Sequence, residues 1–262
     1  MVKNQKVVRS WRLGASVVLL CACQSVPYTK RKHLVLVSAG EEASLGESSY
    51  KDALAKAKVS SDAEATALVR RVGERIAAAA DKPDYHWEFN LLDDPKTVNA
   101  WCLPGGKVAV YSGLLPITKD ENGLAVVLGH EISHALARHG SERMSQGLLA
   151  QLGGVALGAA LASKPDATQQ LAQQAYGAGA TVGVLLPFSR AQESEADHIG
   201  LILMAKAGYD PEGAVPFWQR MASAAGAGGN STPEFLRTHP ADDKRIEAIK
   251  KELPEARGYL KK

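Results

Sequence analysis

Two histidines four residues apart, in the segment His130-Glu131-Ile132-Ser133-His134, constrain this chain more than any other feature. The apolar run from Gly123 to Gly129 before them predicts that they lie on a buried helix. Positions four apart on a helix differ by only about 40° in direction, so both imidazoles project from one face. Burying three ionisable side chains on one helix is costly unless a metal ion pairs them. This pattern predicts one zinc ion held by both histidines, with Glu131 as a general base.

A third metal ligand is expected downstream, in the acidic stretch Arg190 to Asp197. Glu193 has Asp197 four residues later on its own helix face, whereas Glu195 points about 200° away from Glu193. In the pair Glu193 and Asp197, one carboxylate can bind the metal, while the other accepts a hydrogen bond from the second ring nitrogen of a ligand histidine. We therefore favour Glu193 as the ligand. Glu195 is the alternative, although a solvated acidic face suits it.

Two further residues of metal-binding type receive ordinary structural roles. His139 follows His134 by five residues, where astacin-type zinc peptidases have six and a glycine between, and it lies about 180° around the helix from His130. We expect a polar residue at the helix end, where the helix dipole favours a cation. Cys102 has apolar flanks and is expected to pack in a buried strand.

The N-terminal segment, residues 1–22, is expected to be a signal peptide, because four basic residues precede a short apolar run. The run ends Leu20-Cys21-Ala22-Cys23, which resembles a bacterial lipobox and predicts lipidation of Cys23 as an anchor in the membrane. A cut near Ala22 that leaves Cys23 as a free thiol is the alternative. Ser25, in place of the aspartate of inner-membrane retention, indicates an outer membrane lipoprotein that faces the periplasm.

Composition and charge bound the class of protein. The chain is 45% hydrophobic and 23% charged, which is typical of a globular protein. The formal net charge of +3 includes the four basic residues of the signal, so the remainder is near −1. We therefore expect no nucleic acid as a partner.

Periodicity predicts a mainly helical α+β fold, with a tether at 23–40 and one domain at 41–262. Two strands joined by Pro104-Gly105-Gly106 predict a small antiparallel hairpin beside the active-site helix. That helix is expected to begin at Asp120 or Thr118, to run through Arg138 and to stop at Gly140. The other expected elements are helices at 41–58, 62–80, 189–206 and 240–252, and strands at 87–92, 98–103 and 107–111.

Two uncharged stretches, Met144 to Ser163 and Ala167 to Ser189, are long enough in principle to span a membrane. They are rich in Gly, Ala and Gln, so their insertion into a bilayer would be weak. We expect helices packed over the active site of a soluble domain.

Four motifs in order resemble one family of zinc metallopeptidases. They are the two metal motifs above, the strand motif Asn99 to Lys107, and Thr238-His239-Pro240 with Arg245-Ile246. The resemblance is to the group of HtpX and the CAAX prenyl protease, and within it to the periplasmic BepA, LoiP and OMA-like branch. It covers about 26–259, with Trp101 where Phe is commoner.

The resemblance implies a zincin-type domain with one Zn²⁺ per chain. Its ligands are His130, His134 and Glu193, with Glu131 in catalysis and Asp197 holding a ligand.

Two further sites follow from the resemblance. His239 lies near the metal, where it stabilises an oxyanion or occupies the open position of a resting state; a turn residue before Pro240 is the alternative. The strand edge at Asn99, Ala100 and Trp101 binds an extended substrate.

These features predict an endopeptidase that hydrolyses unfolded or misassembled cell-envelope proteins, with outer-membrane assembly machinery as a candidate partner. The alternative is a lipid-anchored chaperone or assembly factor with a structural or latent zinc site. Glu131 argues against it, because a structural site needs no general base and closes with a fourth ligand. A permanently bound His239 would favour it.

Overall fold

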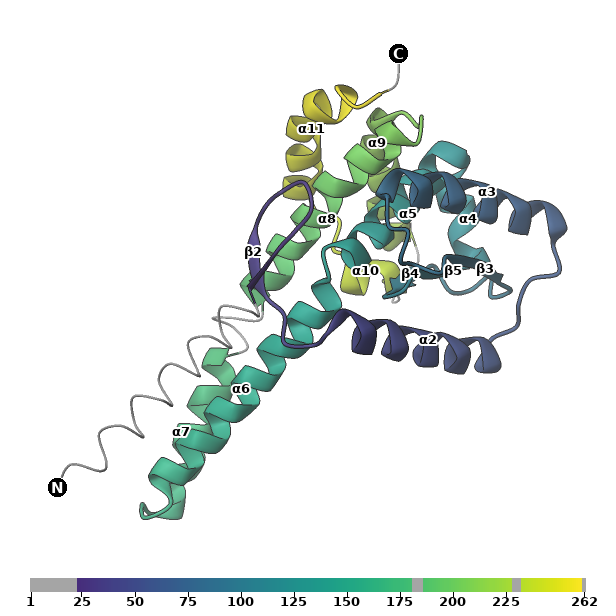
Figure 1. The fold of residues 1–262 in the computed structure, drawn as a ribbon. Helices are drawn as coiled ribbons and strands as arrows, with labels where there is room; N and C mark the ends of the chain where they lie inside the picture. The colour runs from purple at the N-terminus through teal and green to yellow at the C-terminus, as the bar shows by residue number, and fades with distance from the viewer. Residues whose placement is uncertain (1–22, 181–185, 228–231, 261–262) are drawn as a thin grey trace. The chain divides into compact units, whose positions relative to one another are not determined.

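The computed structural model describes residues 23–180, 186–227 and 232–260 (Figure 1). The predicted signal peptide lies outside them. The chain divides into two compact units, Met1–Ser38 with Gly140–Leu186 and Ala39–His139 with Pro187–Lys262. The described residues are mainly helical with two small sheets, which confirms the predicted fold class.

The larger unit holds the predicted metal motifs. Its elements are α2 (Ala39–Lys56), α3 (Ala63–Ala80), β3 (Glu88–Leu92), β4 (Ala100–Leu103), β5 (Lys107–Tyr111), η1 (Ser112–Leu114), α4 (Leu115–Thr118), α5 (Glu121–Leu136), α8 (Leu186–Lys206), η3 (Pro211–Gly213), α9 (Ala214–Ala227), α10 (Glu234–Thr238) and α11 (Asp243–Arg257).

Its sheet has the strand order β3-β5-β4. The β4–β5 hairpin turns through Gly105 and Gly106, whose φ angles of 85° and 87° favour glycine, as the sequence predicts. β3 pairs with β5 in parallel, so the sheet is mixed rather than wholly antiparallel. β4 is therefore an edge strand of this sheet, as expected for a substrate-binding strand.

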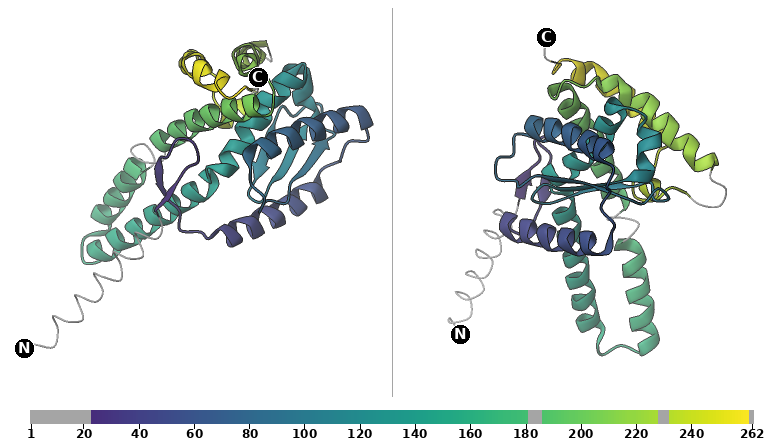
Figure 2. Two further views of the ribbon diagram at one scale, coloured as in Figure 1. Left: turned by 45° about the horizontal axis from the view of Figure 1, so that its top comes forward. Right: turned by 90° about the vertical axis from the view of Figure 1, so that its right-hand side faces the viewer.

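Helices cover both faces of this sheet, with α2 and α3 on opposite sides (Figure 2). On one face, Gly73 of α3 lets Phe89 approach so closely that a Cβ there would lie 2.3 Å from the ring. On the other face, Tyr50 of α2 meets Trp101 edge to face, with 5.8 Å between ring centroids. The sheet and α3 thus form a rigid support for α5, which packs against α3 and β4.

α5 is capped and buried as predicted, but it ends earlier. Asp120 accepts a hydrogen bond from the backbone N–H of Gly123 at 2.8 Å, and the helix closes at Leu136 with Ala137 as its C-cap. Arg138 takes a left-handed φ of 55° and donates to Glu42 at 2.5 Å. The expected stop at Gly140 is wrong, because the chain turns at Arg138 and starts α6.

The smaller unit contains a β-hairpin and two helices. β1 (Cys23–Ser25) pairs with β2 (Lys32–Leu34), and α6 (His139–Leu161) and α7 (Asp166–Ala180) follow later in the chain. Glu142 of α6 accepts two hydrogen bonds from Arg31, each 2.7 Å long. The segment expected to be a tether is therefore folded against α6.

α6 matches one of the two uncharged stretches. Among the described residues, it is the helix that is long and apolar enough, by length and composition, to cross a membrane. Its most apolar 18-residue window has a mean hydropathy of 1.3 and is 6% buried. That burial is lower than the sequence-based expectation of a helix packed over the site.

Candidate metal centre

α5 and α8 approach each other closely because glycines meet where they cross. A Cβ on Gly200 of α8 would lie 3.0 Å from the backbone nitrogen of His130, and a Cβ on Gly129 would lie 3.0 Å from Gly200 O. Any larger side chain at either position would push the helices apart. This contact brings the acidic segment of α8 onto the face of α5 that carries both histidines.

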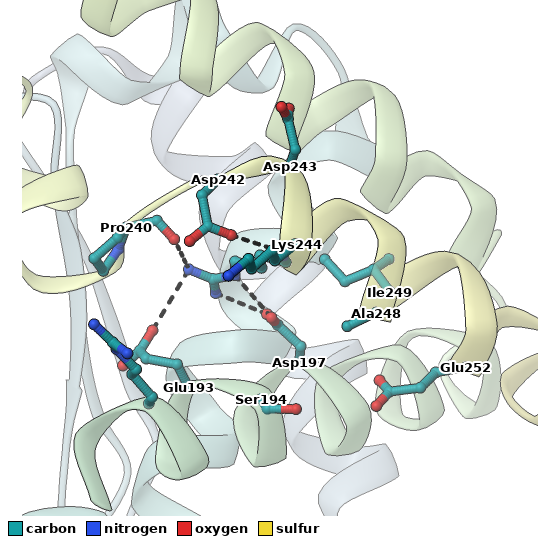
Figure 3. Close-up of a pocket in the computed structure, with 12 residues that line it drawn as sticks. Glu193, Ser194, Asp197, Pro240, Asp242, Asp243, Lys244, Ala248, Ile249 and Glu252 are labelled. Atoms are coloured by element: carbon teal, nitrogen blue, oxygen red, sulfur yellow. Dashed lines mark hydrogen bonds and ion pairs between the residues drawn. The ribbon is translucent and has the colours of Figure 1, made fainter. Parts of the chain in front are cut away.

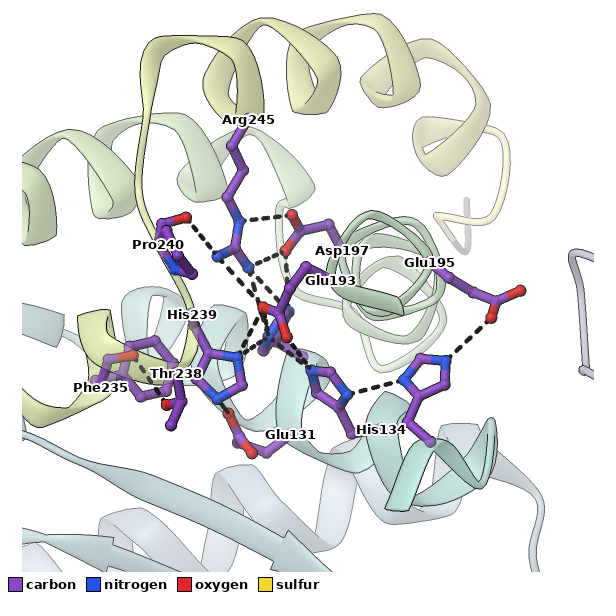
Figure 4. Close-up of polar contacts among 12 residues, drawn as sticks. Glu131, His134, Glu193, Glu195, Asp197, Phe235, Thr238, His239, Pro240 and Arg245 are labelled. Atoms are coloured by element: carbon purple, nitrogen blue, oxygen red, sulfur yellow. Dashed lines mark hydrogen bonds and ion pairs between the residues drawn. The ribbon is translucent and has the colours of Figure 1, made fainter. Parts of the chain in front are cut away.

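Four side chains converge at this crossing, and their donor atoms all lie within 4.8 Å of one another. They are His130, His134, Glu193 and His239. His130 Nε2 lies 3.1 Å from His134 Nε2 and 3.2 Å from His239 Nδ1. The Glu193 carboxylate lies 3.3 Å from His134 Nε2, 3.4 Å from His130 Nε2 and 2.7 Å from His239 Nδ1. Figure 4 shows this convergence.

These separations fit one tetrahedral metal ion. Ligand atoms 2.0–2.2 Å from a tetrahedral zinc lie about 3.4 Å apart. Four of the five separations above, from 3.1 to 3.4 Å, are close to this, and the Glu193–His239 separation of 2.7 Å is shorter. Imidazole nitrogens with one carboxylate oxygen are also a donor set that zinc accepts. The residues present therefore fit the metal that the sequence predicts.

Asp197 contacts His130 on the side of the ring that faces away from the other donors. Its Oδ1 lies 2.9 Å from His130 Nδ1, so the Nε2 atom of this histidine faces the cluster. Arg245 donates to both oxygens of Asp197, at 2.7 and 2.8 Å, and its guanidinium lies 3.5 Å from the ring centroid of Trp218. This stacked arginine fixes the carboxylate, which in turn fixes the histidine. From the sequence, Arg245 was placed in a family motif but no role was predicted for it.

Glu131 lies in the same cluster and is 4% exposed. Its Oε1 lies 3.4 Å from His239 Nε2 but makes no hydrogen bond to any described residue. Burial raises the pKa of this carboxyl, while the charge of His239 opposes the shift. A buried carboxylate oxygen without a hydrogen bond is costly, and such an atom is commonly aimed at a bound water or ion.

The pKa shifts of the cluster follow from its burial and from the carboxylates beside its histidines. Burial disfavours charge on His130, but hydrogen bonds to Asp197 and Glu193 outweigh it and raise the pKa to about 9. Burial lowers the pKa of His134 well below its usual value, so this ring is neutral, as a metal ligand must be. Burial would raise the pKa of Glu193, but hydrogen bonds from three histidines lower it.

His139 and Glu195 are not the surface residues expected from the sequence. His139 is fully buried, with its Nδ1 2.8 Å from His134 Nδ1 and its Nε2 3.0 Å from Glu195 Oε2. The helix-rotation argument fails because α5 ends before His139. The left-handed Arg138 redirects the chain, so His139 opens α6 and returns to His134.

His239 reaches the cluster from α10, a short helix that the sequence did not predict. It is the C-cap of this helix, and its backbone N–H donates to Phe235 O at 2.8 Å. The backbone N–H of Phe235 in turn donates to Val98 O at 3.0 Å, just before β4. The histidine is thus fixed by a helix end rather than by a turn that opens a helix.

A cavity of about 630 Å³ lies between α8 and α11 (Figure 3). Glu193 and Asp197 belong to its lining, together with Arg245, whereas His130 and Glu131 do not. The cavity therefore reaches the cluster from the side of α8. Burial and nearby carboxylates raise the pKa of Glu252, also in this lining, to about 7.

The strand residues predicted to bind substrate lie beside α5. The ring of Trp101 faces Tyr50, and Asn99 Oδ1 accepts from the N–H of Ala100 at 2.9 Å. Cys102 has a pKa raised well above its usual value by burial and by the charge of Glu131. Cys102 is half-buried rather than fully buried, and its raised pKa makes it a poor nucleophile at neutral pH. Cys23 is the first residue of β1, and its lipidation stays a prediction.

Two buried helices here gather histidines and one carboxylate beside a second buried carboxylate whose Oε1 accepts no hydrogen bond from a described residue. This arrangement is typical of a metallopeptidase centre. Residues 63–253 match peptidase family M48, and the chain belongs to this family, as the sequence motifs indicated. The match runs from the start of α3 into α11, so it includes every residue of the cluster.

Three relatives show the range of the similarity. The mitochondrial metalloendopeptidase OMA1 of Schizosaccharomyces pombe is 39% identical over 246 residues, which are 93% of this chain and 70% of that protein. OMA1 of Saccharomyces cerevisiae is 39% identical over 180 residues, which are 65% of this chain and 48% of that protein. The β-barrel assembly-enhancing protease of Yersinia pestis is 32% identical over 213 residues, which are 80% of this chain and 43% of that protein. The chain therefore spans less than half of two of these relatives.

The relatives contradict the predicted location. Mitochondrial metalloendopeptidases of fungi, a plant and animals match this chain, which overturns the prediction of a bacterial outer-membrane lipoprotein facing the periplasm. The prediction relied on a basic, acid-free N-terminal segment. Secretory signals and mitochondrial transit peptides both have this character, so the pattern does not separate them.

Proposed function

We propose that this metallopeptidase uses one zinc ion, held by His130, His134 and Glu193, to hydrolyse internal peptide bonds of unfolded or misassembled proteins. The convergence of these donors around the buried Glu131 carries the proposal. Zinc bound there would supply Lewis-acid activation of the attacking water and of the peptide carbonyl.

Glu131 is the group that moves the proton. Its Oε1, which accepts no hydrogen bond from a described residue, would accept a proton from the attacking water and then deliver it to the leaving amine. Burial raises the pKa of this carboxyl above its usual value, which makes it a stronger base for the proton of the attacking water. Asp197 and Arg245 keep His130 in the orientation that the metal requires.

The edge of β4 supports an extended substrate. Because Tyr111 N–H donates to Asn99 O, alternation along the ladder turns the backbone groups of Ala100 and Cys102 to the free edge. A peptide added there would gain hydrogen bonds that do not depend on its sequence. Unfolded or misassembled chains are the substrates that such a site selects. The Yersinia pestis relative is named for enhancing β-barrel assembly, which adds proteins of that assembly process as candidate substrates and partners.

Removal of the metal tests this function. Dialysis against a zinc chelator is expected to abolish cleavage of unfolded casein, and one equivalent of Zn²⁺ should restore it, because the ligands are preformed. Zinc content and cleavage rate are measured on the same samples. A chain that cleaves casein at an unchanged rate after the metal is gone would contradict the proposal.

His239 supports a second candidate, a latent or structural zinc site. With His130, His134 and Glu193 it completes four protein donors, which is the closed set of structural sites and leaves no position for water. We propose that it closes the site in a resting enzyme. A chaperone that uses zinc only for structure would have the same closed set, but would not explain the buried Glu131.

Changing His239 to alanine is therefore expected to raise the rate of casein cleavage, because it opens the fourth position while three ligands remain. The control is His198→Ala on α8, whose ring lies 3.8 Å from Glu252 and outside the cluster. A fall in kcat of about 100- to 1000-fold at constant KM would instead make His239 an oxyanion stabiliser. An unchanged rate would contradict both roles.

A further inference from the structure

His134 is the one predicted histidine ligand whose second ring nitrogen meets another imidazole. Its Nδ1 lies 2.8 Å from His139 Nδ1, and His139 Nε2 lies 3.0 Å from Glu195 Oε2. His139 is 0% exposed and Glu195 is 7% exposed. Figure 4 shows these contacts as a continuous path from His134 to Glu195. The path leads away from the four donors of the cluster.

One arrangement of protons satisfies every contact in this path. His134 Nε2 faces Glu193 at 3.3 Å, so this nitrogen is the one available to a metal. A neutral His134 that binds through Nε2 carries its proton on Nδ1 and donates it to His139 Nδ1. His139 then carries its own proton on Nε2 and donates it to Glu195. The carboxylate at the end of the path therefore selects the metal-binding tautomer of His134.

The same helix serves both histidine ligands. Asp197 holds His130 directly, whereas Glu195, two residues earlier on α8, points about 200° away from Glu193 and reaches His134 through His139. The left-handed Arg138 makes this possible, because it ends α5 and turns His139 back to the cluster. Each predicted ligand histidine is thus connected by hydrogen bonds to a carboxylate of α8.

We propose that His139 and Glu195 are a positioning pair that fixes the tautomer and orientation of His134 for metal binding. The inference rests on the proposed metal site and extends it, since neither residue touches the metal or the substrate. The competing role is a buried ion pair that ties the start of α6 to α8 and contributes only to folding. Metal affinity separates the two roles.

The test is the affinity of the purified full chain for Zn²⁺ alone, measured by competition with a chromogenic chelator. His139→Phe keeps an aromatic ring but neither donates nor accepts a hydrogen bond, and we expect it to weaken zinc binding by about 10- to 100-fold. In His139→Gln, the amide can accept from His134 and donate to Glu195 at once. We expect this variant to bind zinc clearly more tightly than His139→Phe, with an affinity close to that of the wild type.

A matched control comes from the smaller unit, where His33 Nδ1 lies 3.4 Å from Glu142 Oε2 and both side chains are buried. His33→Phe removes a comparable pair and is expected to lower stability without changing zinc affinity. Melting temperatures with and without zinc give a second readout. Removal of a structural pair lowers the melting temperatures with and without zinc equally. Removal of a positioning pair also reduces the rise in melting temperature that zinc produces.

Two results would overturn the inference. One is a folded His139→Phe that binds zinc as tightly as the wild type; the other is a His139→Gln as weak as His139→Phe. If His139→Phe does not fold, Glu195→Ala takes its place, because it removes the acceptor of the His139 Nε2 proton. Unchanged zinc affinity in that variant also overturns the inference. Failure of the proposed metal site looks different, because then the wild type itself binds no zinc. Failure of the proposed hydrolysis alone leaves the zinc affinities unchanged and shows as a wild type that binds zinc but does not cleave casein.

Discussion

Glu131→Gln is expected to abolish peptide hydrolysis while zinc and fold are retained. The substitution keeps the shape of the side chain and removes its ability to take a proton. Loss of a general base costs about 100- to 10,000-fold in rate. All four donor atoms of the cluster remain, so zinc content should stay near that of the wild type. The measurements are casein cleavage, zinc content and the circular dichroism spectrum.

The matched control for this prediction is Glu121→Gln. Glu121 lies ten residues earlier on the same helix, at the surface, where it pairs with Arg71. Its replacement should leave both cleavage and zinc content unchanged. If Glu131→Gln retains cleavage at a comparable rate, the proton must move through another group. If it loses zinc, the variant measures metal binding rather than the base.

The core of the metal centre could be predicted because regular helices carry it. His130 and His134 lie four apart within one uninterrupted helix, so their common direction follows from helix geometry. The same geometry separates Glu193 from Glu195 on α8, and the structure places Glu193 among the donors. The β4–β5 hairpin was predictable from two glycines that tolerate a left-handed backbone.

The other features of the site could not be predicted, because they depend on irregular backbone that no residue type in the sequence indicates. Arg138 takes a left-handed φ although it is neither glycine nor asparagine, so the end of α5 and the return of His139 were not visible in the sequence. The parallel pairing of β3 with β5 is a contact between strands that are not neighbours in the chain. α10, which carries His239 at its end, has only five residues and too short a periodic pattern to detect.

Glu193→Ala is expected to lose zinc, because this carboxylate occupies the centre of the cluster. Its oxygens lie 2.7 Å from His239, 3.3 Å from His134 and 3.4 Å from His130. Without it, three imidazoles would face the metal with no negative charge to balance it. Zinc content after dialysis, and the rise in melting temperature on adding Zn²⁺, should both fall to the level of a chain without metal.

Glu195→Ala is the matched comparison, since it removes an equal carboxylate two residues along the same helix. It should still hold stoichiometric zinc, with an affinity lowered by about 10- to 100-fold, because Glu195 acts through His139 and His134. A larger loss in Glu195→Ala than in Glu193→Ala would reverse the assignment and make Glu195 the ligand. We expect Glu193→Ala to lose more zinc affinity than Glu195→Ala. Removing Glu193 takes away a bond to the metal, whereas removing Glu195 leaves all metal ligands in place but holds His134 less firmly.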